Sequence, residues 1–439
     1  MPQAATTTQP AAAPARRPVD DCVHCGFCLP VCPTYVAWGE EMDSPRGRID
    51  LFRAVGEGAV ALDPTVARHF DRCLGCMACL GACPSGVRYD TILEEARVLV
   101  ERDHRRSLGE RLKRSLVFWL FPHPGRLRLA AALLWLWRAS GLRWLFRKTG
   151  LLEILSPWMA RLDGLAPDLS PDQLRPALAG ATPARGERRG RVGLLTGCVQ
   201  GVFFPAVNEA TVRVLSAEGF EVVVPPGQGC CGALSVHAGR DEEARRMARA
   251  LIELFEASGV ETVVLNAAGC GSHLKDLSLL FRGDQAWTAR AAAFSRRVKD
   301  VNELLASVPP RAERHPLVAR VAYHSPCHLG HAQGIQAQPR ALLKSIPGLE
   351  LVEIPESDHC CGSAGVYNLL EVEASEEVGR RKVENLLSTK APLVASANPG
   401  CTLHMQRLLR ERGLSVAAAH PIEILDASIR GEPLGGAGS

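Results

Sequence analysis

The sequence predicts a multidomain protein of the α plus α/β class, in which a small helical module precedes two tandem Rossmann-like α/β repeats. Two observations predict this architecture. Residues 22–33 (CVHCGFCLPVCP) and 73–84 (CLGCMACLGACP) share the pattern C-x2-C-x2-C-x3-C-P. Farther along, two segments repeat the same order of cysteines with an offset of 129 to 131 residues. The 439 residues of the chain also exceed the ~250–300 residues at which a single core stops growing.

The two cysteine runs have the spacing of ligands to cubane iron–sulfur clusters. Short gaps let one loop wrap three thiolates around a cluster, while the fourth cysteine lies too far round the turn and ligates the other cluster. The proline after each run ends the loop, because its ring fixes φ and removes a donor. We therefore expect two [4Fe-4S] clusters with crossed ligand sets: Cys22, Cys25, Cys28 and Cys83 for the first, and Cys32, Cys73, Cys76 and Cys79 for the second.

Zinc is the alternative occupant of such cysteines. A zinc ribbon uses two C-x2-C pairs and hence four cysteines per metal. Here eight cysteines fall into two four-membered runs, each followed by proline. This arrangement favours iron–sulfur clusters.

A helical ferredoxin-type domain is expected over residues 19–110. Residues 43–58 (DSPRGRIDLFRAVGEG) have a short apolar helical face, and residues 91–106 (TILEEARVLVERDHRR) are predicted to form a helix. Three arginines of the first of these helices could offset cluster charge or dock a partner, or could simply face solvent: Arg46, Arg48 and Arg53.

Composition limits the partners and the compartment. The net charge of +4 is too weak to indicate nucleic-acid binding. Residues 1–18 are rich in Ala, Thr and Pro without an apolar signal stretch, so we expect a disordered tail. Cysteines at ligand spacing without an export signal indicate metal sites in a reducing compartment rather than disulfides. The expected location is the cytoplasm.

Residues 111–190 are expected to connect the domains. The stretch 111–152 is basic and Trp-rich: it contains no Asp or Glu, nine Lys or Arg, and four of the seven tryptophans. Its longest apolar run, 129–137, has nine residues, far fewer than the ~20 needed to span a bilayer. It either lies peripherally on the inner face of the cytoplasmic membrane or packs as a helical connector against partner subunits or its own domains. Residues 155–190 hold five prolines and are predicted to be a linker.

The two α/β repeats are expected over residues 191–310 and 317–430. RVGLLTGC, FEVVVPPGQGCCG and VETVVLNAAGCGSH in the first copy match RVAYHSPC, LELVEIPESDHCCG and APLVASANPGCTLH in the second. Apolar strand runs alternate with helical patterns such as 250–259 and 378–387. This alternation predicts a parallel sheet covered by helices in each copy, and the duplication predicts pseudo-two-fold symmetry.

Every repeat cysteine follows a predicted strand, at the edge where open α/β sheets bind ligands. The loops of each copy can therefore bring four thiols together, and thiolates prefer soft metals. The two members of each adjacent pair can ligate different irons of one cluster, and the glycine after the pair allows close backbone approach. Buried, reduced structural cysteine is the alternative. All sixteen cysteines are thereby assigned, with a candidate third site at Cys327, Cys360, Cys361 and Cys401 and a candidate fourth at Cys198, Cys230, Cys231 and Cys270.

Histidines accompany these cysteines. His273 and His404 stand three residues after Cys270 and Cys401, which makes them candidate ligands or proton carriers. Others crowd the second copy only; each one singly is expected to be a hydrogen-bonded loop residue, but together they predict a more polar site there: His324, His328, His331 and His359.

Five segments together closely resemble the iron–sulfur subunit of glycolate oxidase (glycolate dehydrogenase): CVHCGFCLPVCPTY, DSPRGRI, DRCLGCMACLGACPSGVRY, HCCGSAGVYNL and ANPGCTLH. The resemblance runs from Asp21 to Asp426 and is weakest over 110–190. The two repeats resemble the cysteine-rich CCG domains of heterodisulfide reductase subunits, glycerol-3-phosphate dehydrogenase electron subunits and lactate-utilisation proteins.

The resemblance implies an oxidoreductase subunit that works in a complex. FAD-bearing partner subunits would oxidise glycolate to glyoxylate, and this chain would carry the electrons to a membrane quinone or another acceptor. The hydroxyacid site is expected on the partner, and no catalytic residue is assigned here. The alternatives are the electron-transfer subunit of a D-lactate or glycerol-3-phosphate dehydrogenase complex, and a thiol/disulfide reductase like heterodisulfide reductase.

The chain departs from the heterodisulfide reductase pattern at one point. Those CCG domains close with C-x-x-C, whereas residues 270–273 read CGSH and residues 401–404 read CTLH. A single [4Fe-4S] cluster, a different metal or a metal-free thiol site therefore remain open for each repeat.

Overall fold

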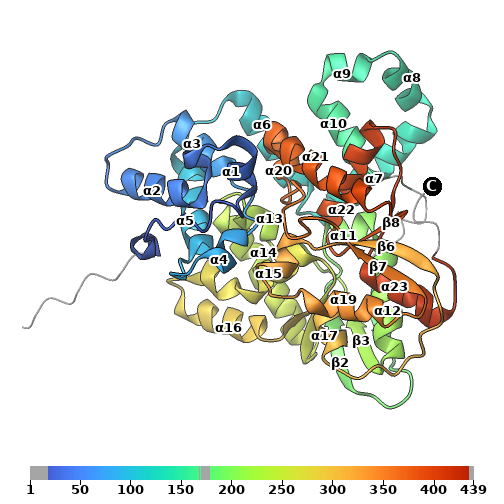
Figure 1. Ribbon diagram of the computed structural model, residues 1–439. Coiled ribbons are helices and arrows are strands. Elements are labelled where there is room, and N and C mark those ends of the chain that lie inside the picture. Colours follow the sequence, from blue (N-terminus) through green and yellow to red (C-terminus); the bar gives the residue numbers. More distant parts are fainter. Residues whose placement is uncertain (1–17, 168, 170–177, 435–439) are drawn as a thin grey trace, which may run out of the picture.

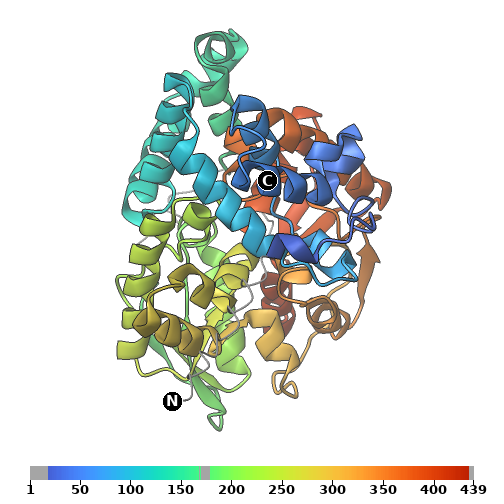
Figure 2. The ribbon, with the colours of Figure 1, turned by 90° about the vertical axis from the view of Figure 1, so that its left-hand side faces the viewer.

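The computed structural model describes residues 18–167, 169 and 178–434, so the tail predicted over residues 1–18 lies, except for its last residue, outside the described residues. A helical module is followed by a helical connector and two α/β units (Figure 1). Figure 2 shows the two α/β units side by side, with the module across the face turned to the viewer. Mixed helical and α/β architecture with parallel sheets is confirmed.

Short helices form the module around the two cysteine runs: η1 (Pro18–Asp21), α1 (Pro33–Trp38), η2 (Glu41–Asp43), α2 (Pro45–Gly56), α3 (Pro64–Asp71), α4 (Ala78–Ala82) and α5 (Tyr89–Asp103). The predicted helices over 43–58 and 91–106 correspond to α2 and α5. Helix α2 begins where it does because Ser44 Oγ accepts a hydrogen bond from Gly47 N at 3.0 Å and Pro45 occupies the first turn.

The described part of the connector contains five helices: α6 (Leu108–Leu120), α7 (Pro124–Ala139), α8 (Leu142–Lys148), α9 (Leu151–Leu155) and α10 (Pro157–Leu165). Val117 and Phe118 of α6 and Leu127 and Ala131 of α7 are buried, so one side of each helix packs on the protein. In the described part of the chain, no helix is long and apolar enough to cross a membrane.

The segment predicted as a linker, 155–190, is partly ordered into elements. Ser156 Oγ accepts a hydrogen bond from Met159 N at 3.3 Å and caps α10. Strand β1 (Gly180–Thr182) pairs antiparallel with β3. Proline is favoured in the first turn of a helix, so the proline content of this segment did not exclude a helix. Residues 168 and 170–177 of the segment lie outside the described residues.

Each α/β unit contains a sheet of parallel strands, with β1 as the antiparallel exception. The first sheet has the order β1-β3-β2-β4-β5 and the second the order β7-β6-β8-β9. The parallel strands are β2 (Gly190–Leu194), β3 (Phe220–Val224), β4 (Thr262–Leu265) and β5 (Val298–Asp300), then β6 (Ala319–His324), β7 (Leu349–Glu353), β8 (Leu393–Ser396) and β9 (Ala417–Ala419). Counted from the first parallel strand of each unit, both orders are 2-1-3-4. Such a sheet has a switch point between its first and third strands, where ligands bind in open α/β sheets.

Helices cover both sheets. The first unit contains α11 (Val199–Phe203), α12 (Pro205–Ala217), α13 (Ala233–Val236), α14 (Asp241–Ala257), α15 (Ala268–Lys275), η4 (Leu277–Phe281), α16 (Gln285–Ser295) and α17 (Val301–Ala306). The second contains α18 (Cys327–Gly330), α19 (Ala337–Lys344), α20 (Tyr367–Leu370), α21 (Val372–Ser388), α22 (Pro399–Glu411) and α23 (Pro421–Arg430).

The two units share one apolar core. Helix α12 contacts α23, and α17 contacts α19. The repeat exchanges α12 with α19 and α17 with α23, so these two contacts are equivalent, as the predicted pseudo-two-fold symmetry requires. Val214 and Leu215 from one unit and Val321 and Tyr323 from the other are fully buried in this core. Each such apolar side chain contributes roughly 1.5–3 kcal/mol.

His420 makes two hydrogen bonds, one of which joins the two units. Its Nε2 lies 2.9 Å from the carbonyl oxygen of Asn266 at the end of β4, and its Nδ1 accepts from Ile422 N at 3.1 Å. Both bonds form together only on a neutral ring, with the proton on Nε2. Burial, opposed by the bond to Asn266, lowers the pKa of His420 to about 4.

We expect acidification to loosen α23 through His420. Between pH 6.5 and 4 the unfolded ring binds a proton that the folded ring excludes, so stability falls as pH falls, by up to about 1.4 kcal/mol per pH unit. Hydrogen–deuterium exchange of the α23 amides, corrected for intrinsic rates, measures this loss. His420→Asn should be less protected at pH 7 but show a flatter pH dependence. Equal slopes in the two proteins would contradict the assignment.

Candidate metal centres

The two cysteine runs fold into loops of the same backbone shape. Residues two and four positions after the first cysteine have positive φ in both loops: His24 (56°) and Gly26 (83°) in one, and Gly75 (60°) and Met77 (62°) in the other. Left-handed conformations are rare for residues such as His and Met, and strain of this kind collects at functional sites. Both loops thus have the same curved backbone, as expected if each wraps three thiols around one centre.

The first predicted ligand set lies close to the surface. Cys22, Cys25, Cys28 and Cys83 line one small cavity, together with Cys79 of the second predicted set. Cys25 is exposed and the other three are half-buried. Burial raises the pKa of Cys28, opposed by a hydrogen bond from the backbone of Arg46. The cysteines that the sequence assigned to one cluster are therefore neighbours, although Cys83 is remote in sequence.

The second predicted set is buried, namely Cys32, Cys73, Cys76 and Cys79. Burial raises the pKa of Cys76 and Cys79 well above the usual value, and the charges of the other cysteines add to this. The pKa of Cys73 is lowered. Burial opposes the lowering, but the guanidinium groups of Arg48 and Arg97 and a hydrogen bond from Tyr89 outweigh it. The Tyr89 hydroxyl lies 3.5 Å from Cys73 Sγ.

The motif DSPRGRI forms a buried network that supports this set. Asp43 accepts from Arg48 Nη2 at 3.3 Å and Arg72 Nη1 at 2.9 Å, and lies 2.9 Å from His69 Nδ1. Asp43 is 0 % and Arg48 1 % exposed. Gly47 permits the close approach, because a Cβ there would lie 2.0 Å from the carbonyl oxygen of Glu41. The three arginines considered from the sequence have different partners. The charge of Arg48 lowers the pKa of Cys73, Arg46 pairs with Glu41, and Arg53 donates to the carbonyl oxygen of Val19.

The repeat cysteines lie beyond the carboxyl ends of strands, as predicted, in matching loops. Cys198 Sγ and Cys230 Sγ are 3.6 Å apart, and Cys327 Sγ and Cys360 Sγ are 4.0 Å apart. Hydrogen bonding to the neighbouring thiol, followed by burial, raises the pKa of Cys198 and of Cys327.

A glycine after each cysteine pair shapes these loops. Gly232 N donates to Cys230 Sγ at 3.4 Å and Gly362 N to Cys360 Sγ at 3.5 Å. Both glycines have positive φ, 94° and 87°, and a Cβ at Gly362 would lie 2.4 Å from the carbonyl oxygen of Ser375. A substituted residue would therefore displace the sulfur donors.

The histidines divide into two groups. Four are engaged elsewhere: His328 Nε2 lies 2.9 Å from Gly75 O, His331 Nε2 2.8 Å from Asp358 O, His359 Nδ1 3.6 Å from Glu356, and His404 Nε2 3.3 Å from Ser375 O. In contrast, ligand atoms of His324, Cys361 and Cys401 all lie within 4.8 Å of one another. His273 is buried, with Nε2 lacking a partner among the described residues.

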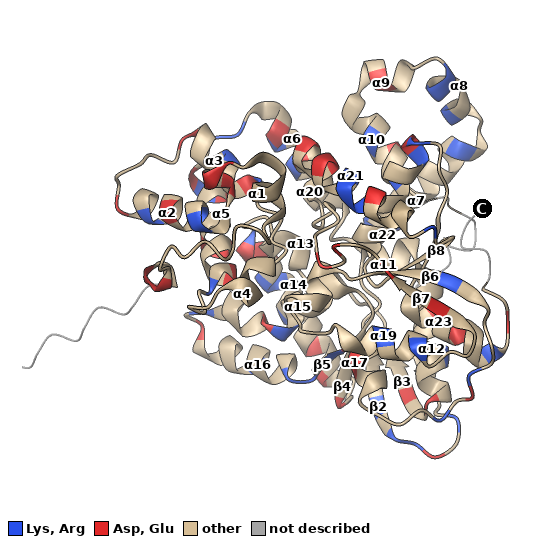
Figure 3. Cartoon of the chain, in the orientation of Figure 1, with Lys and Arg blue, Asp and Glu red and all other residues tan. Residues whose placement is uncertain are grey.

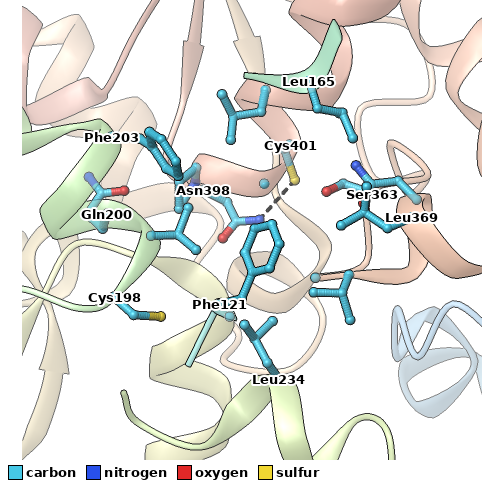
Figure 4. Close-up of a pocket in the computed structure, with 18 of the residues that line it drawn as sticks. Phe121, Leu165, Cys198, Gln200, Phe203, Leu234, Ser363, Leu369, Asn398 and Cys401 are labelled. Carbon is cyan, nitrogen blue, oxygen red and sulfur yellow. Dashed lines mark hydrogen bonds between the residues drawn. The ribbon is translucent and has the colours of Figure 1, made fainter. Parts of the chain in front are cut away.

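One cavity of about 570 Å³ joins both groups of repeat thiols to the connector. All eight repeat cysteines line it, together with apolar side chains of α6, α7 and α10. In Figure 4, Cys198 of one repeat and Cys401 of the other lie around the cavity with Phe121, Phe203 and Leu165. Asn398 Nδ2 donates to Cys401 Sγ at 3.1 Å, the dashed bond in Figure 4.

The buried ligand set packs directly on the second repeat. Cys76 and Leu74 share a small core with Cys360 and Tyr367, and Cys327 packs against it. Two hydrogen bonds reinforce the contact, from Tyr367 Oη to Arg72 O at 2.8 Å and between His328 and Gly75. The thiols Cys198, Cys230 and Cys231 of the first repeat belong to a different core. The thiols therefore form a continuous series from the surface loop to the second repeat.

Comparisons with known proteins match this organisation. A 4Fe-4S dicluster domain matches residues 18–87, the linker region of the glycolate oxidase iron-sulfur subunit matches 109–166, and the cysteine-rich CCG domain matches 192–275 and 321–406. The probable glycolate oxidase iron-sulfur subunit of Bacillus subtilis is 40% identical over 413 residues, 92% of this chain and 93% of the relative. The chain belongs to the glycolate oxidase iron–sulfur subunit family.

Two further proteins are similar to this chain in sequence. The glycolate oxidase iron-sulfur subunit of Escherichia coli is 33% identical over 421 residues, 94% of both chains. Lactate utilization protein A 2 of Bacillus cereus is 30% identical over 237 residues, which is 54% of this chain and 97% of that protein. The lactate protein thus corresponds to about half of this member of the glycolate oxidase family.

The residues fit iron–sulfur clusters in the ferredoxin-type module. The thiols of both runs lie close together there, since Cys73 and Cys79 share a core against which Cys22, Cys28 and Cys83 pack. Gly75 N and Val87 N lie 3.4 and 3.5 Å from the sulfurs of Cys73 and Cys83. The family model and the convergent thiols together support iron–sulfur ligation rather than zinc. The sequence alone did not single out Tyr89, Arg97, Asp43 or Asn398, because nothing in their local pattern indicates which sulfur or charge they would meet.

We expect Asp43→Ala to destabilise the module by roughly 3–5 kcal/mol, because it leaves Arg48 buried without its partner. Denaturant unfolding monitored by the visible cluster absorbance measures the loss. Asp50→Ala is the matched control: Asp50 is 39% exposed and pairs with Arg53 at 3.5 Å, so its loss should cost less than about 1 kcal/mol. Similar effects of the two substitutions would contradict the role of the network.

Proposed function

We propose that this chain is the iron–sulfur electron-transfer subunit of a glycolate oxidase complex. A flavin-bearing partner subunit oxidises glycolate to glyoxylate, and this chain passes the electrons toward a quinone or another acceptor. Family membership over nearly the whole chain supports the reaction. The observation that carries the relay is the series of thiols running from an exposed loop, through a buried loop, to the second repeat.

In this proposal the first cluster, held by Cys22, Cys25, Cys28 and Cys83, receives the electrons. Its loop exposes two apolar side chains, Val23 at 67% and Phe27 at 63%. Apolar side chains beside an exposed ligand suit a docking surface for the FAD-binding subunit. Flavin, substrate and the hydroxyacid chemistry belong to that partner, and no residue of this chain is given a catalytic role.

The second cluster, held by Cys32, Cys73, Cys76 and Cys79, passes electrons inward. Arg48, Arg97 and the Tyr89 hydroxyl surround Cys73, and positive charge and hydrogen bonds to sulfur raise the reduction potential of a cluster. The thiols of the second repeat are the third site and those of the first repeat the fourth. We propose a further iron–sulfur cluster at the third site. We also propose that both repeats have a Rossmann-like fold.

The acceptor is proposed to be a quinone that enters the cavity between the connector and the repeat thiols. The walls supplied by α6, α7 and α10 are mainly apolar, which suits an isoprenoid carrier better than a charged soluble one. The outer faces of the same helices expose large apolar side chains, for example Leu112 at 72%, Trp119 at 53% and Leu129 at 61%. Basic residues are interspersed on these helices and on α8 (Figure 3).

Exposed apolar and Trp side chains with Lys and Arg are typical of a surface that lies in a lipid interface. We therefore propose a cytoplasmic protein bound peripherally to the inner face of the membrane through residues 111–152. Part of the positive charge of this segment is neutralised internally, since Arg114 pairs with Glu101 at 2.7 Å and Arg143 with Asp163 at 3.1 Å. Lipid attraction would thus depend chiefly on apolar contact.

A D-lactate oxidising complex is the second candidate, favoured by the similarity to lactate utilization protein A 2. The match of the connector to the glycolate oxidase linker region favours the first candidate. Oxidation rates of the purified complex with glycolate, D-lactate and glycerol 3-phosphate separate them.

We expect Cys76→Ser to abolish electron transfer from glycolate to the acceptor while glycolate still reduces the flavin of the partner. The substitution removes a ligand of the buried cluster, downstream of the flavin. Stopped-flow flavin bleaching and quinone reduction in the intact complex measure the two steps, and Cys25→Ser should behave alike. Loss of flavin reduction in a complex of unchanged subunit composition would refute the relay.

We expect Ala130→Trp to slow quinone reduction at least about tenfold, equivalent to about 1.4 kcal/mol, because Ala130 lines the cavity and an indole would fill it. Reduction of a water-soluble dye at the exposed first cluster should be unchanged. Ala139→Trp is the control, since Ala139 is an exposed residue at the end of the same helix. Equal rates for the two variants with quinone would argue against this acceptor site.

A further inference from the structure

The two cysteine sites of the repeats differ in the residues around matched thiols. His324 at the end of β6 occupies the position of Leu195 in the first repeat, and Asn398 the position of Ala267. Lys382 of α21 corresponds to Leu251 of α14. All three differences replace an apolar residue of the first repeat with a polar one in the second.

His324 lies against the thiols of its own repeat. It is 1% exposed, and neither ring nitrogen has a hydrogen-bond partner among the described residues. A buried imidazole without a partner is costly, unless a nitrogen binds something else. Its nearest candidates are Cys361 and Cys401, whose sulfurs lie within 4.8 Å of its ligand nitrogen and of each other. In the first repeat, Leu195 packs into the apolar core that holds Cys198, Cys230 and Cys231.

His404, which the sequence offered as the replacement for the closing cysteine, is turned away. Its Nε2 lies 3.3 Å from both the hydroxyl and the carbonyl oxygen of Ser375. Gly379 makes room for that ring, since a Cβ there would lie 2.6 Å from Nε2. The closing position of the CCG pattern is therefore not the position from which an imidazole reaches the thiols.

We propose that His324 is an imidazole ligand of an iron–sulfur cluster in the second repeat, so that the cluster has mixed thiolate and imidazole ligation and the first repeat cannot hold its equivalent. This rests on the proposed third site. Four thiols and one imidazole exceed the four donors of a tetrahedral zinc ion, but they suit a cluster that contains several irons. The five donors are Cys327, Cys360, Cys361, Cys401 and His324.

Two neighbours suit a negatively charged cluster at this place. The amide of Asn398 donates to Cys401. The ammonium of Lys382 is 1% exposed, donates to the carbonyl of Glu356 at 2.7 Å, and interacts electrostatically with Cys361, Cys360 and Cys401. Hydrogen bonds and a buried cation both offset thiolate charge, and the apolar residues at the matching positions of the first repeat offer neither.

The thiols and the imidazole of this site lie at different distances along the proposed electron path. Cys327 and Cys360 face the buried ferredoxin-type loop at Cys76, whereas the imidazole lies at the Cys361–Cys401 end. A neutral imidazole in place of thiolate raises the reduction potential of a cluster. The second repeat would thus be an electron sink relative to the preceding cluster, and transfer would be directed toward the cavity.

The test uses the full chain in its complex, purified anaerobically and labelled with 15N-histidine. Pulsed EPR of reduced and oxidised samples should show a 15N hyperfine coupling in the wild type. His324→Leu, which copies the first repeat, should lose the coupling together with up to one cluster's iron and sulfide. His324→Cys should lose the coupling, keep the iron, and lower the reduction potential of that cluster. His331→Ala, which removes a half-buried histidine at the end of α18 whose Nε2 lies 2.8 Å from the carbonyl oxygen of Asp358, should change none of these.

The outcomes distinguish a failure of His324 as the ligand from a failure of the proposed cluster in the second repeat. Absence of any histidine coupling in the wild type, or its persistence in His324→Leu and His324→Cys, overturns His324 as the ligand. In that case Cys361→Ser decides the site: a loss of iron in this variant keeps the cluster of the second repeat, and unchanged iron refutes that cluster as well. Retention of the signals of the two ferredoxin-type clusters shows that each variant is folded.

Discussion

Buried thiolate charge requires compensation, and the positions of the surrounding polar groups follow from that requirement. Transfer of an ion from water into a low-dielectric interior is strongly unfavourable unless opposite charge or hydrogen-bond donors accompany it. Around Cys73 the compensation comes from Arg48, Arg97 and Tyr89. Arg48 is itself buried, so it requires Asp43, and Asp43 in turn holds His69 of α3 and Arg72 at the end of the same helix. The network that stabilises the module is thus an extension of the metal centre.

Duplication produced two α/β units with the same strand order and the same loop geometry, and only their side chains distinguish them. Gly232 and Gly362 keep the same backbone donor on the first cysteine of each pair. At the three matched positions compared above, the first repeat is apolar and the second polar. The second repeat is also the one whose thiols meet the ferredoxin-type loop. These polar groups thus lie in the repeat whose thiols meet the buried loop, as expected if charge moves through that side.

The connector joins the redox sites to the surface. Its inner side packs through Val117, Phe118 and Leu127, and its helices close the cavity that the repeat thiols share. Its outer side exposes apolar and aromatic groups. A single segment can therefore form one wall of an acceptor site and present the face from which a lipid-soluble acceptor would arrive.

Local sequence pattern determined the features that depend on spacing: the ligand loops, the helices α2 and α5, the repeat, and the position of each repeat cysteine beyond a strand. Spacing suffices there because backbone geometry converts it directly into position. Tertiary structure alone decided which repeat the buried loop meets, that His324 rather than His404 turns toward the thiols, and that residues within the expected linker form helix α10 and strand β1. Those outcomes depend on side-chain direction and on packing between segments far apart in the chain, such as Cys76 against Cys360 or His404 against Gly379. No local pattern encodes these contacts.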